Sequence, residues 1–260
     1  MATQQSSQIL TGTDRLIVAL DVPTTDDALR LVETLDNVST FKVGWQLYIT
    51  GNVMALLQRL SEKRVFIDLK IPGDIGNTIG SVVEMCVTSN VMFLTLSESA
   101  PPATVRAARQ ARGSRTYPKL LTVPLLSSMD QDDLREMLDG DVDRDELILR
   151  RAQAAVDAGC DGVIASGDAI RICRGRFGDK VVIVSPGIRP SGTASDDHKR
   201  HTTARQAIQL GADYLVVGRP ILTDRDPRAA AQRIINDIDS ALKDQRDDAR
   251  VDLGLRGGRG

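Results

Sequence analysis

Aromatic residues are scarce in this sequence: they make up 3% of its 260 residues. A core of any size must therefore be built mainly from Val, Ile, Leu and Ala. The chain also has no run of about 18 apolar residues, so no membrane-spanning helix is expected. No signal peptide is evident at the start of the sequence.

Cysteine and excess charge are also lacking. Cys86, Cys160 and Cys173 are scattered and show no CxxC spacing, so we expect reduced thiols in a cytoplasmic protein. The formal net charge is −2, whereas a general nucleic-acid binder normally carries a basic excess. We therefore expect neither nucleic acid nor membrane as a partner.

What the sequence does contain is a recurring unit, in which a short apolar run is followed by a turn and an amphipathic stretch. Most of the runs are almost continuously apolar, as expected for parallel strands covered on both faces. The predicted strands are 15–21, 40–44, 64–70, 91–96, 119–125, 162–166, 181–187 and 213–218. Helical patterns lie between them, for example over 26–35, 52–62, 145–159 and 203–211.

Eight such units predict an α/β protein, a single (β/α)8 TIM barrel with a parallel eight-stranded core. The alternative is a doubly wound open sheet. That fold would require a Gly-rich phosphate loop after the first strand, and "ALDVPTTDD" contains none. We expect the barrel to span 14–243, preceded by a flexible arm over 1–13 and followed by a disordered, polar tail over 244–260.

The stretch "FIDLKIPGDI" places opposite charges near the end of a buried strand. Asp68 and Lys70 are two residues apart, so their side chains point to the same face. Active sites of such barrels lie at the carboxyl ends of the strands. We therefore predict one alternating charge array, formed by Lys42, Asp68, Lys70 and Asp74.

Each charged residue also has a purely structural interpretation. Asp68 and Lys70 could form an ion pair that plugs the barrel, and Lys42 could extend to solvent. Asp74 precedes an apolar-periodic stretch and is a good helix N-cap candidate. Asp21, at the end of the first strand, could cap the next turn.

A phosphate site is expected after the last two strands. The loop over 186–200 is long and rich in Gly and Pro, which is typical of functional loops. Backbone amides near Gly187 and Gly218, together with the guanidinium of Arg219, would bind a phosphate dianion. The structural alternative for Arg219 is an ordinary surface arginine.

In combination, these motifs resemble the orotidine 5′-monophosphate decarboxylase family. The resemblance rests on "DLK" and "DIGNT" around the third strand, "PGIRP" after the seventh and "ADYLVVGRPI" at the eighth, and it runs from about Asp14 to about Leu242. It implies cofactor-free, metal-free decarboxylation of orotidine 5′-monophosphate to UMP by a homodimer.

The resemblance also implies roles for the matching residues. Lys70 would be the proton donor to C6, Asp68 would lie against the substrate carboxylate, and Asp74 and Thr78 would reach across the dimer interface. The remaining positions would bind substrate: Asp21 and Lys42 at the ribose (Lys42 also joining the charge array), Ser128 at the pyrimidine, and Gly187, Gly218 and Arg219 at the phosphate.

The sequence departs from the family pattern in two places. Three residues separate Lys70 from Asp74, where the family has two, and a Pro-Gly turn could absorb the extra residue. His198 stands where the family has Gln, and it could still donate to phosphate or pyrimidine and would titrate near neutral pH.

Two other functions remain open. One is a metal-dependent keto-sugar-phosphate decarboxylase with the same barrel, in which acids at the third strand would hold Mg²⁺. The other is a non-catalytic homologue that binds pyrimidine nucleotides, in which the extra residue before Asp74 has dismantled the array.

Overall fold

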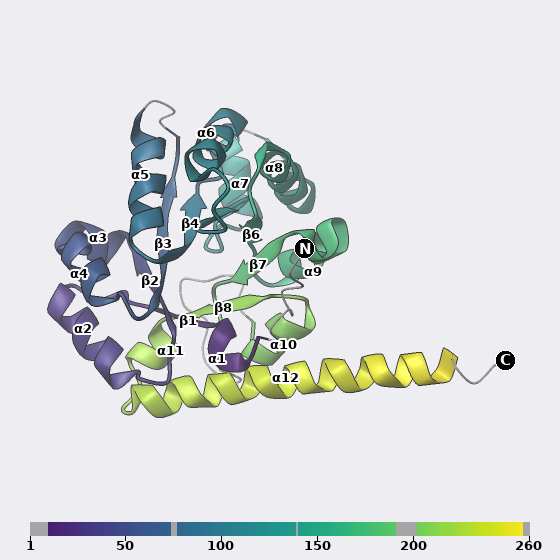
Figure 1. The fold of residues 1–260 in the computed structure, drawn as a ribbon. Coiled ribbons are helices and arrows are strands. Elements are labelled where there is room, and N and C mark those ends of the chain that lie inside the picture. The colour runs from purple at the N-terminus through teal and green to yellow at the C-terminus, as the bar shows by residue number, and fades with distance from the viewer. Residues whose placement is uncertain (1–9, 74–76, 139, 191–201, 257–260) are drawn as a thin grey trace, which may run out of the picture.

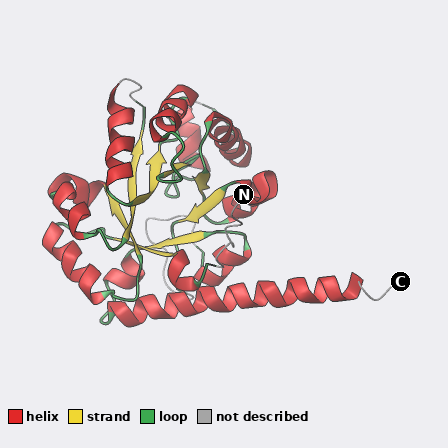
Figure 2. Ribbon diagram, viewed as in Figure 1, coloured by secondary structure: helices red, strands yellow, loops and turns green. Residues whose placement is uncertain are grey.

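The computed structural model describes residues 10–73, 77–138, 140–190 and 202–256. Eight parallel strands close into a barrel in sequential order, and helices surround it (Figure 1, Figure 2). The predicted (β/α)8 fold is therefore confirmed. The strands are β1 Leu16–Ala19, β2 Thr40–Gly44, β3 Arg64–Ile71, β4 Val91–Leu96, β5 Lys119–Thr122, β6 Gly162–Ile164, β7 Val182–Ser185 and β8 Tyr214–Val217.

The helices start and stop at local signals in the sequence. The Thr24 hydroxyl accepts from the Asp27 amide at 3.1 Å to cap α2, and Gly159 ends α8 in a left-handed conformation just before β6. The elements are α1 Gly12–Arg15, α2 Thr25–Thr34, α3 Trp45–Thr50, α4 Val53–Arg59, α5 Asn77–Thr88, α6 Pro102–Arg112, α7 Gln131–Leu138, α8 Arg144–Ala158, α9 Asp168–Phe177, the 3-10 helix η1 Gly178–Lys180, α10 Ala204–Gln209, α11 Arg219–Leu222 and α12 Pro227–Arg256.

The core has two layers. Leu, Ile, Val and Ala dominate the layer between strands and helices, as the composition predicts. The barrel interior is different, because several of the few aromatic residues gather there. Phe93 contacts Phe66 and Tyr214 edge-to-face, with ring centroids 5.7 and 5.1 Å apart. These large rings fill the barrel below the cavity described in the next section.

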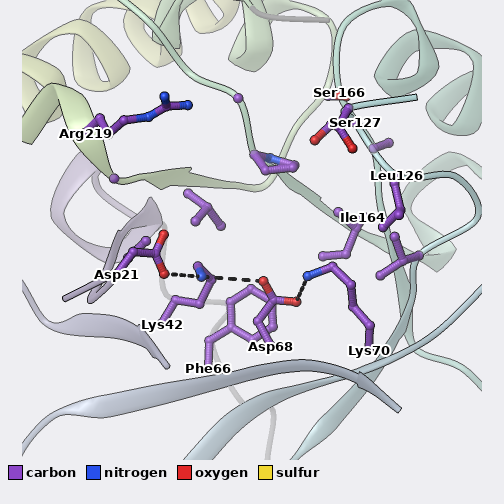
Figure 3. Close-up of a pocket in the computed structure, with 18 of the residues that line it drawn as sticks. Asp21, Lys42, Phe66, Asp68, Lys70, Leu126, Ser127, Ile164, Ser166 and Arg219 are labelled. Carbon is purple, nitrogen blue, oxygen red and sulfur yellow. Dashed lines mark hydrogen bonds and ion pairs between the residues drawn. The ribbon is translucent and has the colours of Figure 1, made fainter. Parts of the chain in front are cut away.

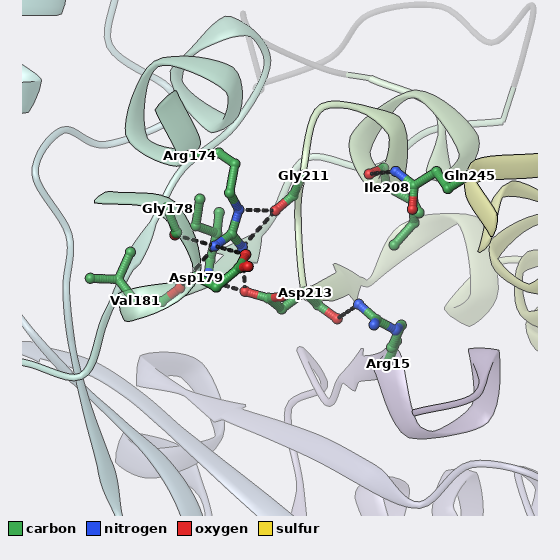
Figure 4. A network of polar contacts seen from close by, with 10 residues as sticks. Arg15, Arg174, Gly178, Asp179, Val181, Ile208, Gly211, Asp213 and Gln245 are labelled. Atoms are coloured by element: carbon green, nitrogen blue, oxygen red, sulfur yellow. Dashed lines mark hydrogen bonds and ion pairs between the residues drawn. The ribbon is translucent and has the colours of Figure 1, made fainter. Parts of the chain in front are cut away.

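Arginine–aspartate pairs fasten the amino ends of the strands. Arg174 on α9 donates to the carbonyl of Gly211 and to the carboxylate of Asp213, which in turn accepts from the Ile183 amide (Figure 4). Arg112 on α6 binds the carboxylate of Asp161 in the same way, at the β5–β6 pair instead of the β7–β8 pair. In both cases the aspartate directly precedes a strand, so each pair holds two neighbouring strands together.

Helices begin within the predicted N-terminal arm and extend into the predicted C-terminal tail. Residues 1–9 lie outside the described part, but Leu10 packs against the barrel interior, and Thr11 caps α1 with a capping box. In the segment from residue 244, for which a disordered tail was predicted, α12 continues as far as Arg256. Its Gln, Arg, Ala and Leu residues are good helix formers, although its four Asp residues are not, and the Gln245 side chain donates to the Ile208 carbonyl at 2.9 Å.

Across the described ranges, none of the helices is both long enough and apolar enough to span a bilayer.

Candidate active site

A cavity of about 550 Å³ opens at the carboxyl ends of the strands. Its lining comes from β1, β2, β3, β6 and β8 and from the segments that follow β5, β7 and β8, so almost the whole barrel contributes. Eight predicted site residues are in its lining: Asp21, Lys42, Asp68, Lys70, Ser128, Gly187, Gly218 and Arg219. The structure thus brings these residues together, while their individual roles stay predictions.

A row of alternating charges crosses one edge of the cavity (Figure 3). The Lys42 ammonium lies 3.0 Å from Asp21 Oδ1 and 3.6 Å from Asp68 Oδ2. The Lys70 ammonium lies 2.9 Å from Asp68 Oδ1. Asp68 is therefore held between two lysines. The row comes from β2, from β3 and from the loop that follows β1.

The carboxylate of Asp68 is the buried centre of this row, with 15% of its side chain exposed. Burial alone would raise its pKa, but the positive charges of Lys42 and Lys70 and hydrogen bonds from Lys70 and Thr95 lower the pKa below its ordinary value. Asp68 is consequently a stable anion at neutral pH. An anion fixed between two cations is a preorganised electrostatic environment.

The backbone of β3 is distorted where it carries these charges. Lys70 has φ +46°, a left-handed conformation that costs a residue with a Cβ about 1–2 kcal/mol. The β3–β4 pairing shifts between Ile67 and Ile71. This bulge lies at the cavity edge, where strain is often stored in functional sites.

Gly44, at the end of β2, leaves space for the row. A Cβ at this position would lie 3.0 Å from the Lys42 nitrogen and 3.4 Å from Asp21 Oδ1. Any larger residue would therefore press on the Lys42–Asp21 pair.

Positive charge also gathers at the predicted phosphate side of the cavity. Gly187 has φ +76°, and Gly218 directly precedes Arg219 at the start of α11. Arg189, a residue that the sequence analysis did not single out, is buried and lines the same cavity. Its place inside "PGIRP", two residues after Gly187, was a signal for it. The backbone of Arg189 is fixed by a bond from its amide to the Thr202 carbonyl at 3.0 Å.

Hydroxyl groups occupy the opposite side. Figure 3 shows Ser127 and Ser166 across the cavity from Arg219. Ser128, the predicted residue, also lines the cavity but is exposed, whereas Ser127 is half-buried and Ser166 is buried. Ser166 follows β6, and no motif in the sequence pointed to it.

Three predicted residues are not placed in this cavity. Asp74 and His198 lie outside the described residues, so their positions stay predictions. Thr78 is exposed on the first turn of α5 and is not part of the cavity lining. That position is compatible with the predicted role toward a partner subunit.

The lining as described is electropositive. Four cationic side chains and two carboxylates face the cavity, giving a net charge of +2, in a chain whose formal net charge is −2. Within the described ranges, no three His, Cys, Asp or Glu side chains form a group suited to hold a metal ion. The site is chemically suited to a small anionic ligand with polar groups at its far end.

The fold and this cavity define a (β/α)8-barrel protein with a charged small-molecule site at the carboxyl ends of its strands. Comparison with known families extends this description. The model of the "Orotidine 5'-phosphate decarboxylase / HUMPS family" matches residues 14–234, and the chain belongs to that family.

Individual relatives agree with this assignment. The chain is 44% identical over 224 residues to the orotidine 5′-phosphate decarboxylase of Methylococcus capsulatus, covering 85% of this chain and 90% of the relative. It is 45% identical over 231 residues to the enzyme of the same name from Jannaschia sp., covering 86% and 98%. These relatives are carboxy-lyases by name.

A solved structure shows the same architecture. The crystal structure of orotidine 5′-phosphate decarboxylase from Lactobacillus acidophilus matches with a TM-score of 0.74 and 28% identity, covering 86% of this chain and 99% of that one. The agreement in sequence and in fold confirms the family resemblance inferred from the motifs.

Proposed function

We propose that this chain decarboxylates orotidine 5′-monophosphate to UMP, the last step of de novo pyrimidine nucleotide synthesis, without metal or organic cofactor. The observation that carries the proposal is the buried Asp68 carboxylate held between Lys42 and Lys70 at the cavity edge. The family and the names of the relatives supply the substrate. We place this activity in the cytoplasm.

The substrate would lie across the cavity. Its phosphate would bind on the side of Gly187, Gly218 and Arg219, where positive charge gathers. The pyrimidine would lie near the serines on the opposite side, with Ser128 at its amide. Asp21 and Lys42 would hold the ribose between the two ends. In this pose the carboxylate on C6 faces Asp68 and Lys70.

The bond between C6 and the carboxylate carbon breaks as CO₂ leaves, and the electron pair stays on C6. The Lys70 ammonium stabilises this developing charge and then transfers its proton to C6, which forms the C6–H bond of UMP. Lys70 is left as a neutral amine and takes up a proton from water.

Asp68 contributes in two ways. It holds the Lys70 ammonium at 2.9 Å, and its charge repels the substrate carboxylate. At about 4 Å and an effective dielectric constant of about 20, two such charges repel by about 4 kcal/mol. This repulsion is relieved when CO₂ departs. Phosphate binding at a distance from C6 supplies further energy to hold the substrate in this strained position.

The proposed enzyme is a homodimer in which Asp74 and Thr78 reach the partner's site. Large apolar side chains on α3 and α4 are exposed, namely Trp45, Tyr48, Ile49 and Met54. These helices follow β2, and α5, which carries Thr78, follows the adjacent strand β3. An exposed apolar surface of this kind is a candidate subunit interface.

A direct assay tests the reaction. Purified protein is mixed with orotidine 5′-monophosphate, and the loss of orotate absorbance is followed with and without a chelator. We expect equal rates in both. Complete loss in chelator with recovery in Mg²⁺ would favour the keto-sugar-phosphate alternative, and tight UMP binding without turnover would favour a non-catalytic homologue.

Subunit complementation tests the shared site. Lys70→Ala and Asp74→Ala should each be nearly inactive alone. In a reassorted mixture about half of the dimers are hybrids, and each hybrid has one site with both residues, so activity should recover to roughly a quarter of wild type. No recovery despite hybrids seen by native mass spectrometry would place Asp74 in its own chain's site or outside the reaction.

A further inference from the structure

The bulge in β3 lies opposite a single residue of β4. Ile67 pairs with Leu94, and the next pair is Ile71 with Leu96. Three residues of β3, from Asp68 to Lys70, therefore face only Thr95. Regular strand bonding cannot satisfy such a mismatch, so another group must hold the extra backbone.

The side chain of Thr95 holds the extra backbone of the β3 bulge. Its hydroxyl oxygen accepts from the backbone amide of Lys70 at 2.9 Å, and the hydroxyl donates to Asp68 Oδ1 at 3.1 Å. Thr95 is completely buried and does not line the cavity. One hydroxyl thus contacts the left-handed residue Lys70 and the carboxylate on which the charge row depends.

The hydrogen bond from the Thr95 hydroxyl to Asp68 also fixes the orientation of the Asp68 carboxylate. Oδ1 receives both the Thr95 hydroxyl and the Lys70 ammonium, while Oδ2 faces Lys42 at 3.6 Å. Without the hydroxyl, the carboxylate could rotate about its own axis, and the Lys70 backbone could relax out of its left-handed conformation.

We propose that Thr95 is a positioning residue for the reaction: its hydroxyl clamps the β3 bulge and thereby sets the place of both Asp68 and Lys70. The proposal rests on the proposed function for its effect on turnover. The clamp itself is a property of the fold and can be tested separately. The hydroxyl acts through Asp68 and Lys70 and does not touch the substrate.

Two substitutions separate the hydroxyl from the shape of the side chain. Thr95→Val keeps the volume and the branched Cβ but removes the hydroxyl, whereas Thr95→Ser keeps the hydroxyl and loses a methyl. Thr122→Val is the matched control, because Thr122 is buried on the neighbouring strand β5 and makes no hydrogen bond to Asp68 or Lys70 among the described contacts.

We expect Thr95→Val to lower kcat for orotidine 5′-monophosphate by about 10- to 100-fold, the scale of a small misplacement of reacting groups. KM and UMP affinity should change less than about threefold, since the phosphate and pyrimidine contacts lie elsewhere. Thr95→Ser should restore most of kcat, and Thr122→Val should resemble wild type. Equal impairment in Thr95→Ser and Thr95→Val, or wild-type kcat in Thr95→Val, would overturn the proposal.

Amide hydrogen exchange tests the clamp without any turnover. The Lys70 amide should exchange at least about tenfold faster in Thr95→Val than in wild type or Thr95→Ser. Thr95→Ala provides a second variant without the hydroxyl if the valine variant does not fold. Equal protection of Lys70 in all folded variants would refute the clamp, even if the wild type proved inactive on orotidine 5′-monophosphate.

Discussion

The two ends of the barrel both carry charged side chains, but they use them differently. At the amino ends, Arg112 donates twice to Asp161 and once to the Pro118 carbonyl. Its guanidinium is almost fully enclosed, with 3% exposure for the residue. At the carboxyl ends, Asp68 lies between two lysines that line an open cavity.

The two networks differ in the partners that their charged groups face. The amino-end pairs join one helix and two strands through protein acceptors, so they stabilise the folded state. The carboxyl-end row has a distorted backbone at Lys70 and an electropositive surface facing the cavity. Its charges are arranged for a ligand, and removing them should harm chemistry more than folding.

The largest effect should come from Lys70→Ala. We expect kcat to fall by about 10²–10⁴-fold, the usual contribution of a positioned acid, while the free energy of unfolding falls less than in Arg112→Met, because Asp68 keeps Lys42 and Thr95 as partners. Steady-state assays and urea denaturation measure the two quantities. The control is Lys63→Ala, directly before the other end of β3, where the ammonium donates to the carbonyls of Val38 at 2.7 Å and Asp36 at 3.5 Å; this variant should keep its kcat.

The opposite result is expected for Arg112→Met. The change leaves the Asp161 carboxylate without its buried partner, so the free energy of unfolding should fall by about 2–4 kcal/mol, with kcat unaltered in the protein that remains folded. Arg30→Met, which removes an exposed pair with Asp27, should change the free energy of unfolding far less, because exposed ion pairs are screened by solvent. A selective loss of kcat in Arg112→Met would contradict the division between the two ends.

A smaller effect within the cavity is expected from Arg219→Ala. Loss of a charged hydrogen bond to phosphate costs about 1.5–3 kcal/mol, so UMP should bind roughly 10- to 150-fold more weakly in calorimetry. Uridine, which has no phosphate, should bind as before. Arg225→Ala, an exposed arginine outside the cavity lining, serves as the control. An equal loss of affinity for UMP and uridine would mean that Arg219 does not contact the phosphate.

The smallest effect should appear only in acid. The pKa of Asp68 is lowered in the folded state. The carboxylate therefore stabilises the folded state at pH values above its pKa in the unfolded chain, about 3.9. This contribution disappears as the pH falls through the pKa that Asp68 has in the folded state. The stability difference between wild type and Asp68→Asn should therefore be constant from about pH 8 to 5 and shrink below about pH 4. Urea denaturation across this range measures it. A difference that already shrinks near pH 6 would mean that the lysines do not hold Asp68 as an anion.

The sequence predicted the strands because each is an apolar run bounded by turns, and every observed strand overlaps its prediction, with β3 reaching one residue past it. It also predicted eight residues of the cavity. Seven of them are ionisable or glycine residues near strand ends, which are visible in sequence, and Ser128 came from the family resemblance. Ser166 was missed because a short polar residue after a strand has no distinctive pattern, whereas Arg189 was missed although it lies inside "PGIRP", two residues after Gly187.

The β3 bulge could not be predicted. It arises from the register of β3 against β4, where Thr95 meets three residues, and such pairing depends on residues 25 positions apart. The length of α12 was missed for another reason. Beyond Leu242 the helix has little apolar periodicity, and the polar composition of this stretch favoured a disordered tail.

The low aromatic content has an optical consequence. Trp45 is the only tryptophan in 260 residues, it is 49% exposed, and it begins α3 directly after β2, beside Gln46 of the cavity lining. The intrinsic tryptophan emission of the protein therefore originates at one point, between the active-site cavity and the apolar surface of α3 and α4. A blue shift of this emission that appears on subunit association and reverses on dilution would report burial of the apolar surface. Quenching on addition of UMP would report binding in the cavity. Neither measurement needs an attached dye.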